Sequence, residues 1–196
     1  MRIGVVPQFL QNCEPDVEAN FESSVETLVH LGARIEECDL PGAIETKPSV
    51  VGYEFYEAYK EMFERGPEAF GERVRNMLLR ASKVSADRYA LGAEERGKVE
   101  EVAQKQMAEW DFVIGPTSPV VAEVLGNKEG PNRRSQNTIW FNLTRQPAIA
   151  IPNGQSREGM PTSLMIAGRK FDDAGVLTVA ALYQANTDHH TRRPLV

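Results

Sequence analysis

Two hydroxyl side chains stand where a ligand could meet this chain. Thr117 and Ser118 lie between Pro116 and Pro119, just beyond the apolar run 112–114, which its pattern predicts to be a buried strand. Open α/β sheets bind ligands at the ends of such strands. A serine nucleophile also needs a base and an oxyanion hole, usually formed by a glycine-rich turn. The flanking prolines instead indicate a stiff loop, so we expect Thr117 and Ser118 to line a pocket rather than to attack a substrate.

Asn142 is a further candidate for substrate contact. It lies with Trp140 in a short helix that we predict over residues 135–144. Its amide can donate and accept hydrogen bonds, so it can hold a substrate or, alternatively, cap a helix or bridge loops. Ser23 and Ser24 fall inside an earlier predicted helix, without glycine neighbours or a base, and we expect both to be solvated.

Metal, phosphate and carboxylate chemistry find little support in the sequence. The three histidines are His30, His189 and His190, and the last two stand together in the C-terminal tail. This spacing does not favour a metal site, and no phosphate-binding glycine motif occurs. We therefore expect no metal and no cofactor. Adjacent carboxylates point apart on a helix or strand and are expected to be solvated or to cap helices; these pairs are Glu36-Glu37, Glu94-Glu95 and Asp172-Asp173.

Composition indicates an acidic globular protein. The chain has 196 residues, 41% of them hydrophobic, and a net charge of −6. A nucleic-acid partner is not expected, because phosphate binding needs a basic face. No apolar run approaches the length of a membrane span, the first residues do not resemble a signal peptide, and Cys13 and Cys38 are expected to be reduced thiols of a cytoplasmic protein.

The first forty residues predict a strand–helix–strand unit. A strand over 2–6 is followed by a loop over 7–14 and a helix that begins at Pro15. Residues at helical spacing mark its buried face, and they are Val17, Phe21, Val25 and Leu28. Gly32 ends the helix, and a second strand over 34–40 closes at Pro41-Gly42.

Helices dominate the middle of the chain, and strands return near its end. We predict helices over 50–64, 68–80 and 85–110, with Ser85 as an N-cap. A loop over 126–134 precedes the short helix, and an antiparallel hairpin joins strands 148–151 and 163–167. A last helix begins near Asp172 and buries Val176, Val179, Ala180 and Tyr183. Together these elements predict one α/β domain over 1–196, with a mixed sheet flanked by helices on both faces.

Several segments carry a resemblance to a known family. Phe141-Asn142-Leu143-Thr144 with Pro147-Ala148 looks like the pattern FNLTGLPA, and residues 159–168 look like GLPVGLQLVG. The remaining matches are residues 2–7 with Asp16-Val17, Leu31-Gly32-Ala33 leading into Asp39-Leu40-Pro41, and Asp111-Phe112 leading into Pro116-Thr117-Ser118-Pro119. In this order and spacing they resemble the C-terminal part of the amidase-signature family, so the domain would be one part of that larger fold.

The resemblance implies amide hydrolysis by a serine nucleophile, a second serine on a cis peptide and a lysine base. Neither the glycine- and serine-rich signature nor the lysine segment is present in these residues, so no catalytic residue carries over. What carries over is a contribution to the substrate pocket by Thr117, Ser118 and Asn142. The resemblance thus implies the C-terminal portion of an amidohydrolase that acts on a carboxamide C–N bond only with an N-terminal half.

Two alternatives stay open at this stage. The chain could be a truncated, non-catalytic module for binding or interaction, or one subunit of a split amidase. The expected partner is a small amide, with neither nucleic acid nor membrane. A homo-oligomer formed through an exposed sheet edge or an apolar surface also stays open.

Overall fold

The computed structural model describes residues 1–40, 49–123 and 135–193. The expected turn at Pro41-Gly42 and the expected loop over 126–134 lie outside these residues. The chain divides into two compact units: unit 1 comprises Met1–Glu45 and Val102–Val196, and unit 2 comprises Thr46–Glu101. The expectation of a single domain over 1–196 stays a prediction.

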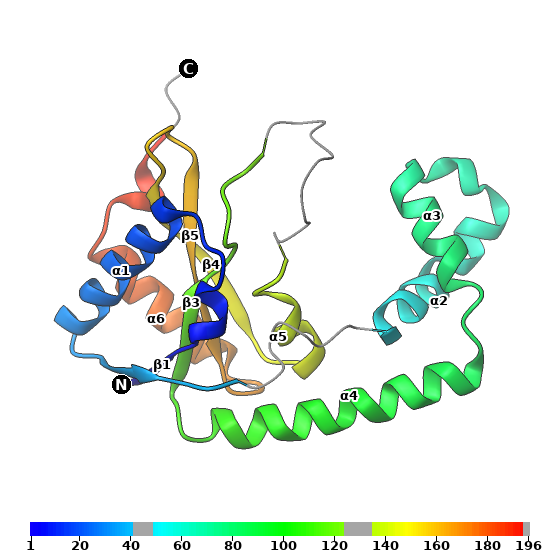
Figure 1. The fold of residues 1–196 in the computed structure, drawn as a ribbon, viewed down its shortest axis with the longest axis horizontal. Helices are drawn as coiled ribbons and strands as arrows, with labels where there is room; N and C mark the ends of the chain where they lie inside the picture. Colours follow the sequence, from blue (N-terminus) through cyan, green and yellow to red (C-terminus); the bar gives the residue numbers. More distant parts are fainter. Residues whose placement is uncertain (41–48, 124–134, 194–196) are drawn as a thin grey trace. The chain divides into compact units, whose positions relative to one another are not determined.

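Unit 1 is built on a mixed five-stranded sheet with the strand order β2-β1-β3-β5-β4 (Figure 1). β1 pairs in parallel with both β2 and β3, whereas β5 pairs antiparallel with β3 and β4. The strands are β1 (Arg2–Val5), β2 (Arg34–Glu37), β3 (Phe112–Pro116), β4 (Ala148–Gln155) and β5 (Pro161–Gly168). The predicted α/β class, mixed sheet and antiparallel hairpin are therefore confirmed.

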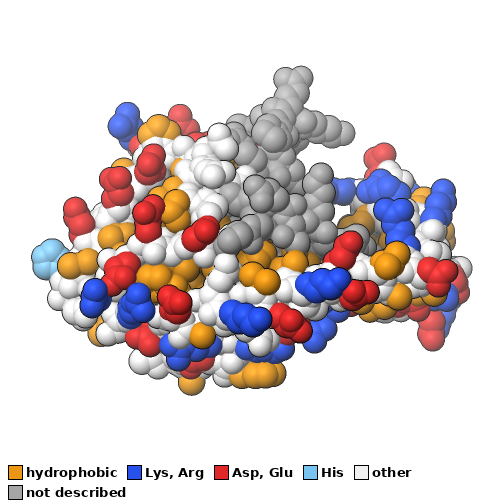
Figure 2. Space-filling model, turned by 60° about the horizontal axis from the view of Figure 1, so that its bottom comes forward, with side chains coloured by type: hydrophobic (Ala, Val, Ile, Leu, Met, Phe, Trp, Pro, Cys, Tyr) orange, Lys and Arg blue, Asp and Glu red, His pale blue; other side chains and the backbone are white. Residues whose placement is uncertain are grey.

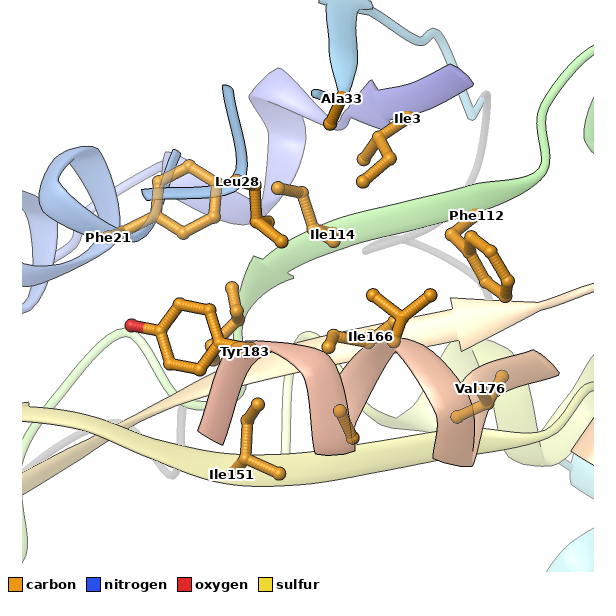
Figure 3. Close-up of a cluster of buried hydrophobic side chains, with 13 residues drawn as sticks. Ile3, Phe21, Leu28, Ala33, Phe112, Ile114, Ile151, Ile166, Val176 and Tyr183 are labelled. Carbon is orange, nitrogen blue, oxygen red and sulfur yellow. The ribbon is translucent and has the colours of Figure 1, made fainter. Parts of the chain in front are cut away.

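One face of the sheet is covered by α1 (Pro15–His30) and α6 (Asp173–Ala185), which both contact β4 and β5. The helical spacing predicted this face correctly, because the marked side chains of both helices are buried except for the half-buried Val25. Figure 3 shows Phe21, Leu28, Val176 and Tyr183 of these helices in one cluster with Ile3, Ile114 and Ile166 of the sheet. The main hydrophobic core of unit 1 lies in this layer.

The opposite face carries the 3-10 helix η1 (Pro7–Leu10) and the short helix α5 (Ile139–Thr144). We expected only a loop over 7–14, so η1 is a difference. Its Phe9 is fully buried against Gly115 of β3, where an added Cβ would lie 2.8 Å from the phenyl ring. Phe9 also packs edge-on to Phe141 of α5, with 5.9 Å between ring centroids. Helices therefore lie on both faces, as predicted.

Unit 2 is helical, and its elements are α2 (Ser49–Arg65), the 3-10 helix η2 (Pro67–Ala69), α3 (Glu72–Ala81) and the first part of α4 (Ala86–Met107). The predicted helix over 68–80 was wrong at its start, because a 3-10 turn comes first and α3 begins only after Gly71. The N-cap at Ser85 is confirmed, since Arg88 N donates to Ser85 Oγ at 3.3 Å. Glu54 joins α2 to α4 by accepting from the Tyr89 hydroxyl and from Arg96.

Surface charge is mixed on the face shown in Figure 2, where acidic and basic side chains are interspersed. The expectation that the chain binds no nucleic acid stays a prediction. In the parts of the chain that the structure describes, no helix is both long and apolar enough to cross a membrane. The remaining described element is the 3-10 helix η3 (His189–Thr191).

Candidate functional site

Thr117 is placed by the carboxyl end of β3. The strand is buried along its whole length, and Thr117 N donates to Ser163 O of the neighbouring strand at 2.9 Å. This bond extends the pairing by one residue and fixes where the Thr117 side chain leaves the sheet. An added Cβ at Gly115 would meet Phe9 of η1, and side chains two residues apart in a strand share a face, so the Thr117 side chain is on the face that carries η1 and α5.

Asn142 is placed by α5, which buries most of its side chains. Trp140, Phe141, Leu143 and Thr144 are buried, whereas Asn142 is exposed. The helix ends at Arg145, whose φ of 56° is left-handed. This conformation ends the helix, and β4 begins soon afterwards at Ala148.

A pocket of about 220 Å³ lies between α5, the end of β3 and the hairpin. The described residues that line it carry no charged side chain, and they are Thr117, Thr138, Phe141, Asn142, Gln146, Ala148, Ile149, Ala150 and Met165. The structure thus brings two of the three predicted site residues, Thr117 and Asn142, into one pocket. This part of the lining combines polar groups with a partly apolar wall, which is typical of a pocket for a small molecule.

Ser118 points its hydroxyl into its own loop instead. Ser118 Oγ donates to Val120 O at 2.7 Å, and Val120 N lies 3.3 Å from the same oxygen. A short turn closed by a serine hydroxyl stiffens a loop, which agrees with the interpretation of the flanking prolines. Ser118 is not among the residues that line the pocket, and its role in substrate binding stays a prediction.

Asn137 is a residue that the sequence did not single out. It is fully buried, and its Nδ2 donates to Phe9 O at 2.9 Å and to Pro116 O at 2.8 Å. One amide therefore ties η1 to the end of β3 and to the segment before α5, and these last two segments adjoin the lining residues Thr117 and Thr138. No local signal marks it, because Gln136-Asn137 is an ordinary polar stretch in the sequence.

Gln146 and Thr138 were also missed as pocket residues. Gln146 is only 7% exposed and lies at the pocket beside Thr117. Among the described residues, neither Thr117 Oγ1 nor Gln146 Nε2 has a hydrogen-bond partner. Buried polar groups normally have partners, and both atoms belong to residues that line the pocket.

Ser24 corrects an expectation, because it is buried rather than solvated. Its hydroxyl accepts from the Tyr183 hydroxyl at 3.1 Å and from Asn153 Nδ2 at 3.0 Å, and donates to Asn20 O at 2.8 Å. Burial raises the pKa of Tyr183, which keeps that hydroxyl protonated. None of these partners is a base, so Ser24 is a structural hydroxyl on the α1 side of the sheet.

Neither a reactive thiol nor a metal cluster adds to the site. Cys38 is buried, and desolvation together with Asp39 and Glu109 raises the pKa of its thiol to about 11, so it is uncharged at neutral pH. Within residues 1–40, 49–123 and 135–193, no group of three His, Cys, Asp or Glu side chains could hold a metal ion. The expectation of no cofactor stays a prediction.

Comparison with known proteins identifies relatives along nearly the whole chain. The family model described as Amidase matches residues 1–177. A glutamyl-tRNA(Gln) amidotransferase subunit from Chloroflexus aggregans is 32% identical over 99% of this chain, which covers 46% of the relative. The corresponding protein from Methanosarcina mazei is 31% identical over 99% of this chain and 47% of the relative. The chain thus spans about half the length of the curated relatives that it matches.

Solved structures give the same assignment. A crystal structure of an amidase superposes with a TM-score of 0.82 at 26% identity, over 94% of this chain and 45% of that one. The corresponding glutamyl-tRNA(Gln) amidotransferase protein of Thermotoga maritima superposes with a TM-score of 0.70 at 27% identity, over 95% of this chain and 42% of that one.

Proposed function

The chain belongs to the amidase family, and from this premise we propose that it forms one wall of the substrate pocket of an enzyme that hydrolyses a carboxamide C–N bond. The wall consists of the end of β3, α5 and the β4–β5 hairpin. Thr117 and Asn142 contact the substrate, and Ser118 holds the loop that carries Thr117. The observation that carries the proposal is that Thr117 and Asn142 line one pocket although the sequence separates them widely.

The chemistry of the pocket suits a neutral amide. A carboxamide has one strong acceptor and one donor, and hydroxyl and amide side chains can satisfy both. A lining without charged side chains imposes no preference for an ionised ligand. Phe141, Ile149 and Met165 offer apolar contact for the carbon part of the substrate.

The nucleophile and the base come, in this proposal, from polypeptide outside residues 1–196. Three observations support this assignment. The glycine- and serine-rich pattern of the family does not occur here, and the buried Ser24 has no base beside it. The relatives are also about twice as long as the matched region.

Complementation tests the proposal directly. The chain is produced together with the unmatched N-terminal half of the Chloroflexus aggregans relative, and ammonia release from propionamide is measured. We expect no turnover by the chain alone and turnover by the pair. Thr117→Val should lower kcat/KM about tenfold by removing a hydrogen bond, whereas Thr178→Val, a matched change on the exposed side of α6, should have no effect.

Three results would decide against the proposal or refine it. Turnover by the chain alone that serine-directed reagents abolish would show that residues 1–196 hold their own nucleophile. Amide binding without turnover by the folded pair would favour the non-catalytic module. The DNA upstream of Met1 distinguishes a single longer polypeptide from a split amidase. An in-frame glycine- and serine-rich segment indicates one polypeptide, whereas a separate neighbouring gene for that segment indicates a split enzyme.

A further inference from the structure

The outward face of α6 carries fewer charges than a solvent-exposed helix normally does. No charged residue and no histidine occurs from residue 174 to residue 187. The inward side chains of α6 belong to the core of unit 1. The exposed apolar side chains lie on the other side of the helix, and they are Ala174, Leu177, Ala181, Leu182 and Ala185. A helix that is apolar on both sides is typical of a buried position, so this face has the composition of a covered surface.

The neighbouring helix α1 shows that this composition is specific to α6. Both helices contact β4 and β5 and cover the same face of the sheet. The exposed positions of α1 nevertheless include Glu18, Glu22 and Glu26, so α1 turns an acidic face outward, as surface helices normally do. A place in this layer therefore does not require a neutral outward face, and the face of α6 needs an explanation of its own.

Phe171, which comes just before α6, leads independently to the same conclusion. Among the described residues of unit 1, Phe171 and Leu177 are the large hydrophobic residues with the highest exposure, 86% and 59%. Phe171 also has a left-handed φ of 69°, which is unfavourable for a bulky side chain. Strained residues gather where a protein binds something, and exposed apolar patches mark interaction surfaces. We call Phe171, Leu177 and Leu182 the α6 surface.

The place of α6 in unit 1 indicates which polypeptide reaches this surface. α6 packs on β4 and β5 (Figure 3), and β4 forms one edge of the sheet. On the opposite face, the same strand lines the pocket with Ala148, Ile149 and Ala150. A polypeptide that completes the pocket and continues around β4 therefore comes to α6.

We propose that the α6 surface docks the polypeptide that supplies the nucleophile and the base. The inference rests on the proposed function, because it states where this second polypeptide binds the chain. More than half of the Chloroflexus aggregans and Methanosarcina mazei relatives lies outside the matched region, and a body of that size can cover both the pocket and α6. Its apolar side chains pack on Phe171 and Leu177, whereas the acidic face of α1 stays in solvent.

Recovery of the partner tests the docking surface without requiring turnover. The 196-residue chain, carrying an affinity tag, is produced together with the unmatched N-terminal half of the Chloroflexus aggregans relative. The amount of that half recovered with the chain is then measured, and we expect equal amounts of the two. Leu177→Glu should lower the recovery about tenfold or more, because a carboxylate would be buried in an apolar contact.

Two further variants distinguish docking from folding. Phe171→Gly removes the ring and suits the left-handed backbone. This variant chain should unfold at the same urea concentration as the unmodified chain, or at a higher one, and still lose about tenfold in recovery. Val29→Glu places the same charge as Leu177→Glu on the outward side of α1, where Val29 is 49% exposed, and should leave the recovery unchanged.

Three results would overturn the proposal. Recovery that Leu177→Glu and Phe171→Gly leave unchanged would show that the partner binds elsewhere. An equal loss with Val29→Glu would show only an effect of the added charge. A chain that forms a dimer by itself in sedimentation velocity, and a monomer after Leu177→Glu, would assign the α6 surface to a second copy of the chain.

The outcomes also separate docking from the proposed function. Recovery that depends on Leu177 and Phe171, with no turnover by the pair, would overturn the proposed function and leave the docking surface standing. Turnover by the pair that Leu177→Glu and Phe171→Gly leave unchanged would overturn the docking surface alone. A soluble partner that is not recovered with the unmodified chain would also overturn the docking surface.

Discussion

At the scale of single residues, two amides do most to form the pocket. Asn137 donates to carbonyl groups of two separate segments beside the pocket, and Gln146 is one of the residues that line it. Both side chains are buried. The Nδ2 donors of Asn137 are used within the chain, so its role is structural, although its Oδ1, like Gln146 Nε2, has no hydrogen-bond partner among the described residues.

Asn137→Ala is expected to destabilise unit 1 by about 2 kcal/mol, because two carbonyl groups lose a buried donor. Urea unfolding followed by tryptophan fluorescence measures the change, since Trp140 lies nearby in α5. Asn186→Ala removes an exposed amide with a single bond to Leu182 O and is expected to change stability by less than about 0.5 kcal/mol. Equal effects of the two variants would contradict the structural role of Asn137.

The Cys38 thiol gives a prediction about pH. Its pKa is raised from the ordinary 9.0 to about 11 in the folded chain, so the unfolded thiol ionises first as the pH rises. The contribution of this thiol to stability is complete below about pH 9 and is lost between 9 and 11. Iodoacetamide at about pH 8 should therefore modify Cys13 in the folded protein and Cys38 only after unfolding, as peptide mass spectrometry can show. Rapid modification of Cys38 in the folded chain would contradict the raised pKa.

At the scale of elements, a polar network fixes α1 against the hairpin. Gly154 brings the bulged strand β4 so close to α1 that an added Cβ would meet the Asn20 side chain at 2.5 Å. Asn153, Thr162 and Ser24 then connect the strands to the helix in a buried chain of hydrogen bonds. Such a network sets the position of the helix along the sheet, because a shift would leave several groups unpaired.

Ser24→Ala should destabilise unit 1 by about 1 to 3 kcal/mol, since Asn153 and the Tyr183 hydroxyl lose their shared partner in a buried place. The neighbouring Ser23→Ala is the matched control, because Ser23 is exposed and its loss should cost almost nothing. Thermal or urea unfolding of both variants gives the comparison. A Ser24→Ala protein as stable as the control would show that the network adds nothing.

The elements also show what the sequence could and could not predict. The helical spacing of Val17, Phe21 and Leu28 identified the buried face of α1, and the apolar runs located β3 and the hairpin. The spacing of apolar residues within one helix or strand predicts which of its faces is buried. It could not predict that Ser24 meets Tyr183 across the core or that Asn137 reaches Phe9, because those contacts join distant segments.

The pocket follows the same rule. Thr117 was found because it follows a strand, and Asn142 because an amide on the predicted short helix can both donate and accept hydrogen bonds. Gln146 was not singled out, because a glutamine after a helix end gives no local signal of a site. Only the structure shows that it is buried and lines the pocket with Thr117. η1 was missed because a single 3-10 turn is too short to show a period.

At the scale of the whole molecule, the two units differ in how much apolar surface they bury. Unit 1 has a continuous core on one face of its sheet. Among the described residues, the buried apolar side chains of unit 2 form a much smaller set, and they are Val50, Phe63, Leu78 and Ala81. Its helices therefore have less burial to support them.

We expect unit 2 to open at a lower free energy than the sheet of unit 1. Native-state hydrogen exchange at increasing urea concentration measures this, with amides of α2 and α3 compared with those of β3 and β5. The helical amides should exchange through a smaller opening event. A single common opening for all four elements would show that the units unfold together.

The place of unit 2 in the chain has a consequence for how such proteins change over time. It lies between β2 and β3, which both pair in parallel with β1. A parallel crossover must be long in any case, so it can hold a whole helical unit without altering the strand register. Insertions, deletions and recombination in Thr46–Glu101 can therefore be tolerated in evolution where the same events within the hairpin would destroy the pocket.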